Sequence, residues 1–486
     1  MESTFLTQHR LVSILEFMIS STHKKCEKCG ATEVAFDIVK QHFICQFCRF
    51  SYSVEAKTDD GLVAFNATAI ADLIGVNQRG GSLNINETAE DVITMKCSGC
   101  GAEVVVNTTM FKNPTCHWCR NVLSINTQIP NGLIPDAVLP FQVTQEEAFE
   151  KIQKFAKSRK GYTIKEVKET LLAQNVHGIY LPYMVADVNA KYVLRGTGNK
   201  VTREYDTLIG NNVRNFTTYK IERDLHFTVD DLILESSAAR SNIENTRNSN
   251  QIINALLPYD VANAVSYDSR FLNDFVSEKR DLNIAEVGEN SEEIIRQLGK
   301  NESMATVSEY DHGVKWKREE LKIKGIRWNA TYLPVWMYSY QGKNARNYYI
   351  AVNGRTGKVM GSMPISKKRV LGKFLIYETI MAAIFGAIWV ATTPSTVMSY
   401  GLFGMMSLLM LVYYPFKTFQ ADTRRLSNRD VKHDYLRETK VETVRTNGKD
   451  RKLWWFAHQY HARKRGANWD NVQKRAKNYH RIGDYS

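Results

Sequence analysis

All eight cysteines of this 486-residue chain fall in Cys-x-x-Cys pairs. Two pairs separated by fifteen residues form each of two sets, and the spacing is identical: Cys26, Cys29, Cys45 and Cys48, then Cys97, Cys100, Cys116 and Cys119. A Cys-x-x-Cys turn places two thiolates on one side of the backbone, and four thiolates complete the tetrahedron that Zn²⁺ prefers, with Zn–S bonds of about 2.3 Å. The spacing therefore predicts two Zn²⁺ ions.

Four thiolates leave no coordination position for water or substrate, so the predicted ions are structural and not catalytic. His117 lies inside the last pair, but Cys119 already supplies the fourth ligand and we do not expect the imidazole to coordinate. A disulfide framework is the alternative use of these cysteines. It is disfavoured because residues 1–25 resemble an amphipathic helix, interrupted by Glu16, and not a secretory signal.

Short strand patterns separate the cysteine pairs, which predicts a zinc ribbon at residues 26–50 (ribbon 1) and another at 93–125 (ribbon 2), joined by a linker at 51–92. Glycine follows the first pair of each ribbon and arginine follows the second pair. Basic side chains around the pairs can offset the −2 formal charge of a Zn²⁺ ion held by four thiolates: Lys24, Lys25, Lys28, Arg49, Lys96 and Arg120.

Residues 130–365 predict an α+β domain with a twisted antiparallel sheet and helices on one face. A weak internal repeat pairs Tyr180-Leu-Pro-Tyr183 with Tyr332-Leu-Pro-Val335, and helical patterns precede each copy at 145–157, 164–172 and 291–298. Asn353-Gly354 predicts a tight hairpin turn. The segment from Asn353 to Lys358 has the wrong spacing for a phosphate-binding loop, and Val359 stands where such a loop needs Ser or Thr. We do not predict an enzyme.

The two most hydrophobic stretches, 371–393 and 397–414, are each near the roughly 20 residues that cross a bilayer. They predict a transmembrane helical hairpin at residues 371–415, with Glu378 near the interface. Basic residues flank both sides, namely Lys367, Lys368 and Arg369 before it and Lys417, Arg424 and Arg425 after it. By the positive-inside rule, the sequence predicts a two-span protein of the cytoplasmic (inner) membrane with both termini cytoplasmic.

The formal net charge of +13 is concentrated in residues 416–486, where Lys and Arg outnumber Asp and Glu by 18 to 8 from Lys417 onward. Basic and aromatic side chains alternate in this predicted helical tail. Such a pattern can contact anionic lipids, nucleic acid or a protein partner. The candidate contact residues are Lys452, Trp454, Trp455, Arg463, Lys464, Arg465, Trp469, Lys474 and Arg475.

Twin ribbons, a β-rich domain centred on Tyr-Leu-Pro, the segment Tyr348 to Val359 and a hydrophobic hairpin together resemble a family of bacterial zinc-ribbon membrane proteins. Members are often labelled primosomal-helicase-like or transcription-factor-IIB-type, although this chain has no helicase motor motifs. The resemblance spans about residues 20–415. It implies a membrane anchor, since some branches anchor phage-shock-type envelope-stress proteins.

The combined expectation is a membrane-anchored adaptor that recruits a cytosolic protein partner to the inner face of the membrane, where the tail contacts lipids. The alternative is a membrane-tethered protein that binds nucleic acid through a ribbon and the basic tail. Closed metal sites and the lack of catalytic motifs favour the adaptor.

Overall fold

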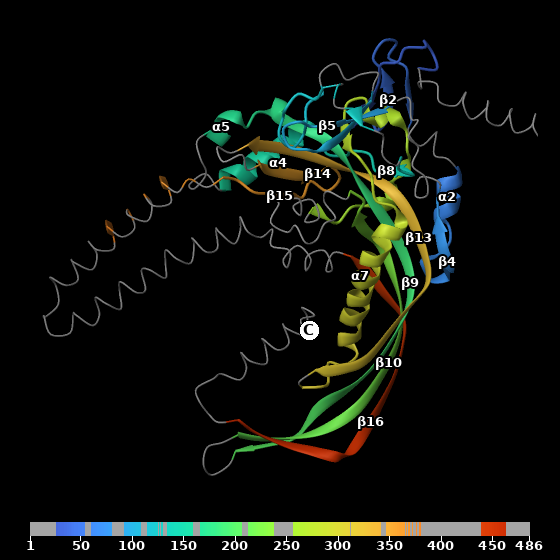
Figure 1. Ribbon diagram of the computed structural model, residues 1–486, viewed down its shortest axis with the longest axis vertical. Helices are drawn as coiled ribbons and strands as arrows, with labels where there is room; N and C mark the ends of the chain where they lie inside the picture. Colours follow the sequence, from blue (N-terminus) through green and yellow to red (C-terminus); the bar gives the residue numbers. More distant parts are fainter. Residues whose placement is uncertain are drawn as a thin grey trace, which may run out of the picture.

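The computed structural model describes residues 26–53, 60–79, 92–107, 114–124, 126, 128–129, 134–158, 166–206, 212–237, 256–311, 313–341, 347–364 and 439–462, with isolated positions between 366 and 380. This part of the chain is mostly β-structure: a 13-stranded sheet and a separate three-stranded sheet that belongs to ribbon 1 (Figure 1). The predicted α+β class, an antiparallel sheet with helices on one face, is therefore wrong.

The strands of the described chain are β1 (Val34–Asp37), β2 (His42–Cys45), β3 (Ser51–Ser53), β4 (Gly75–Gln78), β5 (Val92–Lys96), β6 (Glu103–Asn107), β7 (Gln128–Ile129), β8 (Ala137–Val138), β9 (Val176–Asp206), β10 (Asn212–Glu235), β11 (Val265–Ser266), β12 (Val276–Glu278), β13 (Val314–Gln341), β14 (Asn347–Asn353), β15 (Val359–Gly361) and β16 (Lys440–Ala462). The helices are α2 (Asp60–Asn66), α4 (Gln145–Ser158), α5 (Glu166–Thr170) and α7 (Ile284–Ala305), with 3₁₀ turns η2 (Ile70–Asp72), η4 (Ala173–Asn175), η8 (Val261–Asn263) and η9 (Ser269–Leu272).

Four long antiparallel strands in the order β16, β10, β9, β13 dominate the large sheet. In the half that contains residues 179–190 of β9, nearly every side chain is buried, as expected for strands covered on both faces. From Lys191 to Lys200, burial alternates along β9, so that part of the sheet is covered on one face. The same change occurs in β13 near Gly325.

The two copies of the internal repeat lie opposite each other in the β9–β13 pair. Pro182 faces Tyr332, and Tyr180 faces Pro334. The rings of Tyr180 and Tyr332 stack with centroids 6.3 Å apart. The repeated sequence therefore forms the centre of one antiparallel pair.

Helix α7 covers one face of the long strands, inside the curve of the sheet (Figure 1). It begins with a capping box in which Asn283 and Glu286 exchange side-chain and backbone hydrogen bonds. Gly299 faces the sheet, and a Cβ there would lie 2.9 Å from ring atoms of Phe227 and Tyr192. This close approach explains a glycine in the middle of the helix.

The segment predicted as a linker packs against the opposite face of the sheet. Arg327 donates to Asp187 Oδ2 at 2.6 and 3.0 Å and to the backbone oxygen of Thr68 at 2.8 Å. Asn189 donates to the backbone oxygens of Ala71 and Leu73. These contacts fix α2 and η2 over the buried half of β9 and β13, and β4 pairs in parallel with β13 beside them (Figure 1).

The predicted two-helix transmembrane hairpin, and with it the two-span inner-membrane location, is not supported. Among the residues that the structure describes, no helix is both long and apolar enough to cross a membrane. Helix α7 has 22 residues but carries charged side chains such as Glu292, Glu293 and Arg296, which suit a helix with one solvated face. Nearly all of residues 371–415, and the N-terminal helix predicted at 1–25, lie outside the described residues.

The predicted helical tail is also corrected, because residues 440–462 form strand β16. This strand pairs with β10 from Asp230↔Lys440 to Asn212↔Ala462. β-propensity depends on cross-strand neighbours, and those neighbours lie more than two hundred residues away along the chain.

An ion pair between the buried Arg223 and the partly exposed Asp450 fastens β16 to the inner, α7-covered face. Arg223 donates to both carboxylate oxygens of Asp450, and Tyr310 donates to Asp450 Oδ2 at 2.8 Å. Arg223 also donates to Thr306 Oγ1 at 3.3 Å and to the Thr306 backbone oxygen at 3.2 Å. The Arg223 hydrogen bonds hold the pKa of Asp450 below its ordinary value.

We expect Asp450→Ala to lower the free energy of unfolding by about 2–3 kcal/mol, because it leaves the buried Arg223 guanidinium without its carboxylate. Urea titration at pH 7 measures this loss. Since the folded pKa of Asp450 is depressed, its contribution is complete above the unfolded pKa and disappears as the pH falls through the folded pKa. Lys449→Ala, at a neighbouring exposed position, should change stability little; equal losses in both variants would contradict a stabilising Arg223–Asp450 ion pair.

Candidate metal centres

The four cysteines of ribbon 1 converge on one point. Cys26 Sγ and Cys48 Sγ are 3.6 Å apart, as are Cys29 Sγ and Cys45 Sγ. All four sulfurs lie within 4.8 Å of one another. A tetrahedral site with metal–sulfur bonds of about 2.3 Å has edges of about 3.8 Å, so the arrangement fits a single metal ion.

Ribbon 2 repeats this geometry with Sγ–Sγ distances of 3.4 Å for Cys97 and Cys119 and 3.5 Å for Cys100 and Cys116. These cysteines are free thiols, and the distances are far beyond the roughly 2.05 Å of a disulfide bond. The disulfide alternative is therefore wrong. Both predicted sets of four ligands are brought together, and each can hold one metal ion.

The same backbone turn forms all four halves of the two centres. The residue after each pair has a left-handed backbone, with φ of 72° at Gly30, 60° at Arg49, 78° at Gly101 and 65° at Arg120. In each case its N–H donates to the carbonyl of the first cysteine of the pair, at 2.7–3.0 Å. The glycines adopt this conformation at no steric cost.

The sulfurs within each centre interact strongly. The hydrogen bond from the Cys116 thiol lowers the pKa of Cys100 to about 5, while the same neighbour and burial raise the pKa of Cys116. Negative charge in ribbon 2 is therefore favoured on the exposed Cys100 sulfur. A bound cation removes the remaining protons, since thiolate is the ligand form.

The centres differ in what surrounds them. Strands β5 and β6 of ribbon 2 join the large sheet through β12, whereas ribbon 1 keeps its own sheet. Ribbon 1 is fastened to the body by side chains: Asn273 donates to the backbone oxygen of Val34 at 2.5 Å, and Gln41 donates to that of Phe141 at 2.7 Å.

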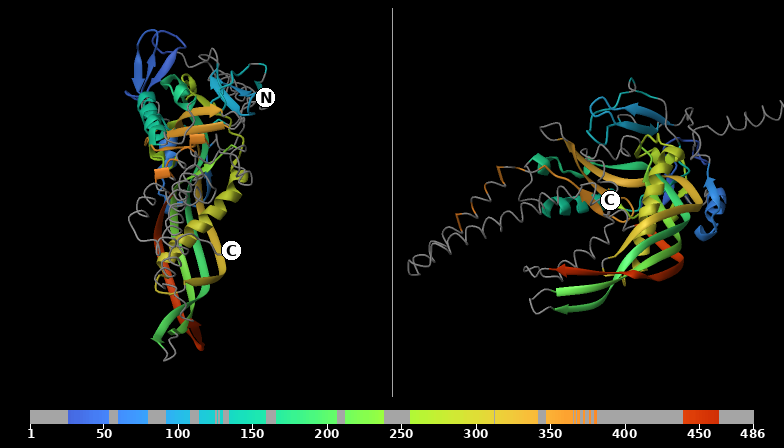
Figure 2. Two further views of the ribbon diagram at one scale, coloured as in Figure 1. Left: turned by 90° about the vertical axis from the view of Figure 1, so that its left-hand side faces the viewer. Right: turned by 60° about the horizontal axis from the view of Figure 1, so that its bottom comes forward.

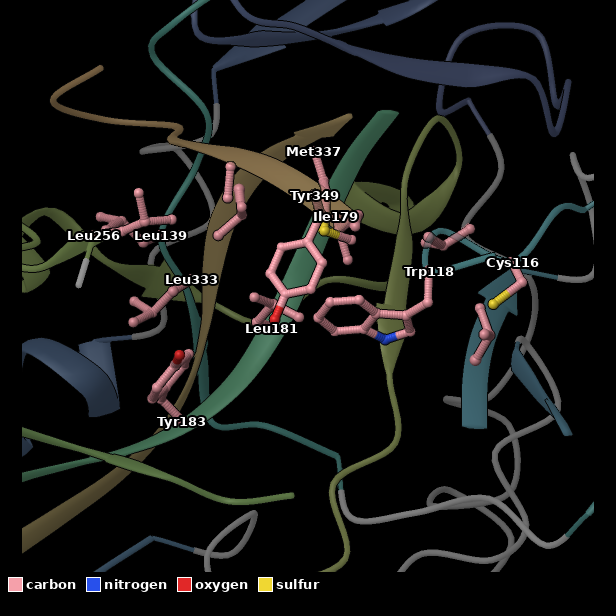
Figure 3. Close-up of a cluster of buried hydrophobic side chains, with 14 of the residues drawn as sticks. Cys116, Trp118, Leu139, Ile179, Leu181, Tyr183, Leu256, Leu333, Met337 and Tyr349 are labelled. Atoms are coloured by element: carbon pink, nitrogen blue, oxygen red, sulfur yellow. The ribbon is translucent and has the colours of Figure 1, made fainter. Parts of the chain in front are cut away.

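A buried carboxylate, Glu278 of β12, holds the last turn of ribbon 2. Its Oε1 lies 2.9 Å from His117 Nε2 and accepts from Trp118 Nε1 at 2.5 Å. The Trp118 ring packs edge-on against Tyr349 with centroids 5.0 Å apart, and Figure 3 shows Trp118 between Cys116 and the main sheet. His117 is thus tied to Glu278 and lies outside the four-sulfur cluster. Sequence reasoning missed Glu278 because nothing near it in the chain signals this contact.

The basic side chains predicted to offset the thiolate charge have other contacts. Lys96 pairs with Glu103 at 3.8 Å, and Arg120 lies over the Tyr338 ring at 4.9 Å and donates to Ser339 Oγ at 3.2 Å. Lys28 lies 5.8 Å from the centre of the Phe50 ring. Lys24 and Lys25 lie outside the described residues.

The segment from Asn353 to Lys358 forms the tight β14–β15 turn that the sequence predicts. Its side-chain donors bind the loop at residues 256–260. Arg355 donates to both carboxylate oxygens of Asp260, and Asn353 Nδ2 donates to the backbone oxygens of Leu256 and Pro258 at 2.9 and 3.0 Å. The turn therefore pins down the preceding loop and has the contacts of a structural element.

A third group of possible ligands, not predicted from the sequence, consists of Asp187, Asp230 and Asp231. Asp187 already accepts from Arg327, and Asp231 occupies a bulge with φ of 54°. Burial, followed by the neighbouring carboxylates Asp230 and Asp187, raises the pKa of Asp231 to about 7. The Arg327 partner and this proton affinity disfavour a cation here.

The candidate contact residues of the tail are placed only in part. Lys452 is exposed on β16. Trp454 and Trp455 lie within β16, but their side chains are not among those described. Arg463, Lys464, Arg465, Trp469, Lys474 and Arg475 lie outside the described residues.

Comparison with known proteins gives one partial similarity. A Bacillus subtilis (strain 168) protein described as uncharacterized protein YdjG is 24% identical over 249 residues, which span 51% of this chain and 69% of YdjG. No protein-family model matches the chain. No solved structure matches it either. The predicted family resemblance thus has its structural support in the two four-cysteine clusters.

We expect the two centres to stabilise different parts of the protein. Cys116→Ser should cost about 3 kcal/mol and lower the main melting transition by about 5 to 10 °C, because ribbon 2 is continuous with the large sheet. Cys45→Ser should unfold ribbon 1 while the main transition stays within about 2 °C. Tryptophan fluorescence separates the two, since ribbon 1 contains no tryptophan and the large sheet contains Trp328 and Trp336. A shift of the main transition by Cys45→Ser as large as that by Cys116→Ser would contradict this division.

Proposed function

We propose that this protein is a zinc-ribbon adaptor, in which two structural Zn²⁺ ions fix the ribbons and ribbon 1 binds a protein partner. Zn²⁺ is supported by the donor set, since four thiolates in a tetrahedral arrangement select soft, tetrahedral metals. The filled shells favour a structural role. The proposal does not include the membrane anchoring that the sequence predicted.

One observation carries the partner-binding role: the third residue of the last cysteine pair has opposite surroundings in the two ribbons. In ribbon 2 it is Trp118, which is 9% exposed because Glu278 and Tyr349 cover it. In ribbon 1 it is Phe47, which is 80% exposed. Ribbon 2 thus demonstrates how this turn docks on a sheet surface through an aromatic anchor.

An exposed aromatic side chain on a rigid turn suits a binding anchor. Aromatic residues are enriched among the few side chains that dominate protein interfaces. The metal centre and the hydrogen bond from Arg49 N–H to the Cys45 carbonyl fix the backbone on both sides of Phe47. Burying Phe47 against a partner therefore costs little conformational entropy of the ribbon 1 backbone.

The nucleic-acid alternative lacks a comparable observation, because most of the tail residues that suggested it lie outside the described part of the chain. The adaptor role is tested on the ribbon 1 surface itself. Elemental analysis of the purified full-length chain should give two zinc ions per chain, as it should for Phe47→Asp, which leaves all eight cysteines intact.

We expect Phe47→Asp to weaken partner binding at least tenfold, because it places a charge in the apolar contact. A partner is first identified by affinity purification of the full-length chain from its native cells, and the purified partner is then titrated calorimetrically. Val63→Asp, at a position of α2 that is 62% exposed, is the matched control and should bind as the parent protein does. If both variants bound equally well, or if Phe47→Asp lost zinc, the proposed surface would be wrong.

A further inference from the structure

The outer face of the extended sheet is unusually basic. We call this half of the sheet the arm: residues 191–206 of β9, 212–227 of β10, 314–324 of β13 and all of β16. Helix α7 covers the inner face of the arm, inside the curve, and the outer face bows away from it (Figure 2). Over the other half of the sheet, α2 and η2 cover the outer face; in the described chain they do not extend over the arm.

The strand register places basic side chains beside one another across the arm. Arg451, Lys220, Thr197 and Lys315 form one row over β16, β10, β9 and β13. All but Thr197 are basic and exposed, with Lys220 at 54% of its side-chain area. Neighbouring strands are about 4.8 Å apart, so these charges lie on one surface.

A second row consists of Lys449, Glu222, Arg195 and Arg318. Glu222 lies 3.9 Å from Arg195 and 3.8 Å from Lys220, so its single charge is shared between two cations. Arg318 is 69% exposed, and the excess positive charge of this row faces solvent.

A further row consists of Arg445, His226, Lys191 and Lys322. Burial and then Lys324, whose Nζ lies 2.9 Å from His226 Nδ1, lower the pKa of His226, so the imidazole adds no charge at neutral pH. Between these rows, Asp224 pairs with Lys191 at 2.8 Å, and Glu320 lies 3.9 Å from Arg318. Lys315, Lys322 and Lys449 form no ion pair within the described part of the chain.

Protection of an open sheet edge does not account for this surface. Lysines on edge strands discourage unwanted strand pairing, and β16 is such a strand in the described chain, with β10 as its neighbour. The basic side chains continue across β10 and β9, which are interior strands, as Lys220 and Arg195 show. The charge therefore belongs to the whole outer face.

We propose that the outer face of the arm binds a protein partner through an acidic surface of that partner. Glu222, Asp224 and Glu320 interrupt the positive charge, which suits a partner with mixed charges better than a continuous row of phosphates. Among the side chains of the arm that the structure describes, the outward positions of these rows carry no aromatic ring for base stacking. The outer face of the arm is convex (Figure 1), so a straight nucleic-acid duplex would contact only a narrow part of it.

The test uses the full-length protein and two fluorescent probes: poly-L-glutamate of about 30 residues as an acidic polypeptide, and a 20-base-pair DNA duplex. We expect poly-L-glutamate to bind more tightly than the duplex at equal salt, with an affinity that falls as salt rises from 50 to 300 mM. Charge reversal by Lys315→Glu, Lys322→Glu and Lys449→Glu together should weaken poly-L-glutamate binding at least tenfold.

The matched control reverses three exposed lysines of α4 (Lys151→Glu, Lys154→Glu and Lys157→Glu), which changes net charge equally and should alter binding less than twofold. Equal losses in both triple variants would show that net charge alone acts and would overturn the proposal. Tighter binding of the duplex, lost in the arm variant, would assign the face to nucleic acid and overturn it as well. Phe47→Asp should leave poly-L-glutamate binding unchanged, so the outcome is independent of the ribbon 1 surface.

Discussion

The pairing of β9 with β13 is the constraint on which the rest of the described structure depends. Its register runs from Gly198↔Val314 to Val176↔Tyr338. Every other part of the large sheet attaches to one of these two strands, directly or through a neighbour: β10 and β16 on one side, β14 and β4 on β13, and ribbon 2 through β12. Because side chains alternate between faces, a slip of one residue would exchange the α7-covered face with the solvated face.

Comparison of the two ribbons shows which features follow from the local sequence and which depend on packing against the rest of the protein. Identical cysteine spacing produces the same left-handed turns and the same convergence of sulfurs in both. The residues between the last two cysteines then diverge. His117 and Trp118 meet Glu278 in the core, whereas Gln46 and Phe47 face outward. The four-sulfur cluster is thus a property of the motif, whereas the contacts of the ribbon depend on its surroundings.

The metal ligands could be predicted from sequence because each half-site is closed by a turn of a few residues. Local patterns also predicted β1, β2, the turn at Asn353 and the start of α4 at Gln145. The 31-residue strand β9 could not be predicted as one strand. Its hydrophobic pattern changes where the sheet passes from being covered on both faces to being covered on one, so the sequence suggests separate segments. Strand β16 and the Glu278 contact depend on residues far away in the chain, so no local pattern signals them. The transmembrane hairpin rested on the hydropathy of two segments and on their basic flanks, and no described helix supports it.

The charged residues of β16 show how the fold determines where a charge predicted from the sequence lies. The excess of Lys and Arg after Lys417 suggests a separate basic tail, but pairing of β16 with β10 places Arg451 beside Lys220 and Arg445 beside His226. The inward positions of the same strand supply Asp450 to the buried Arg223. One strand therefore contributes its outward charges to a solvated surface and its inward carboxylate to the buried Arg223 guanidinium. The alternation of β-structure separates these two roles, and residues with charges of both signs can coexist in one segment because they face opposite sides of the sheet.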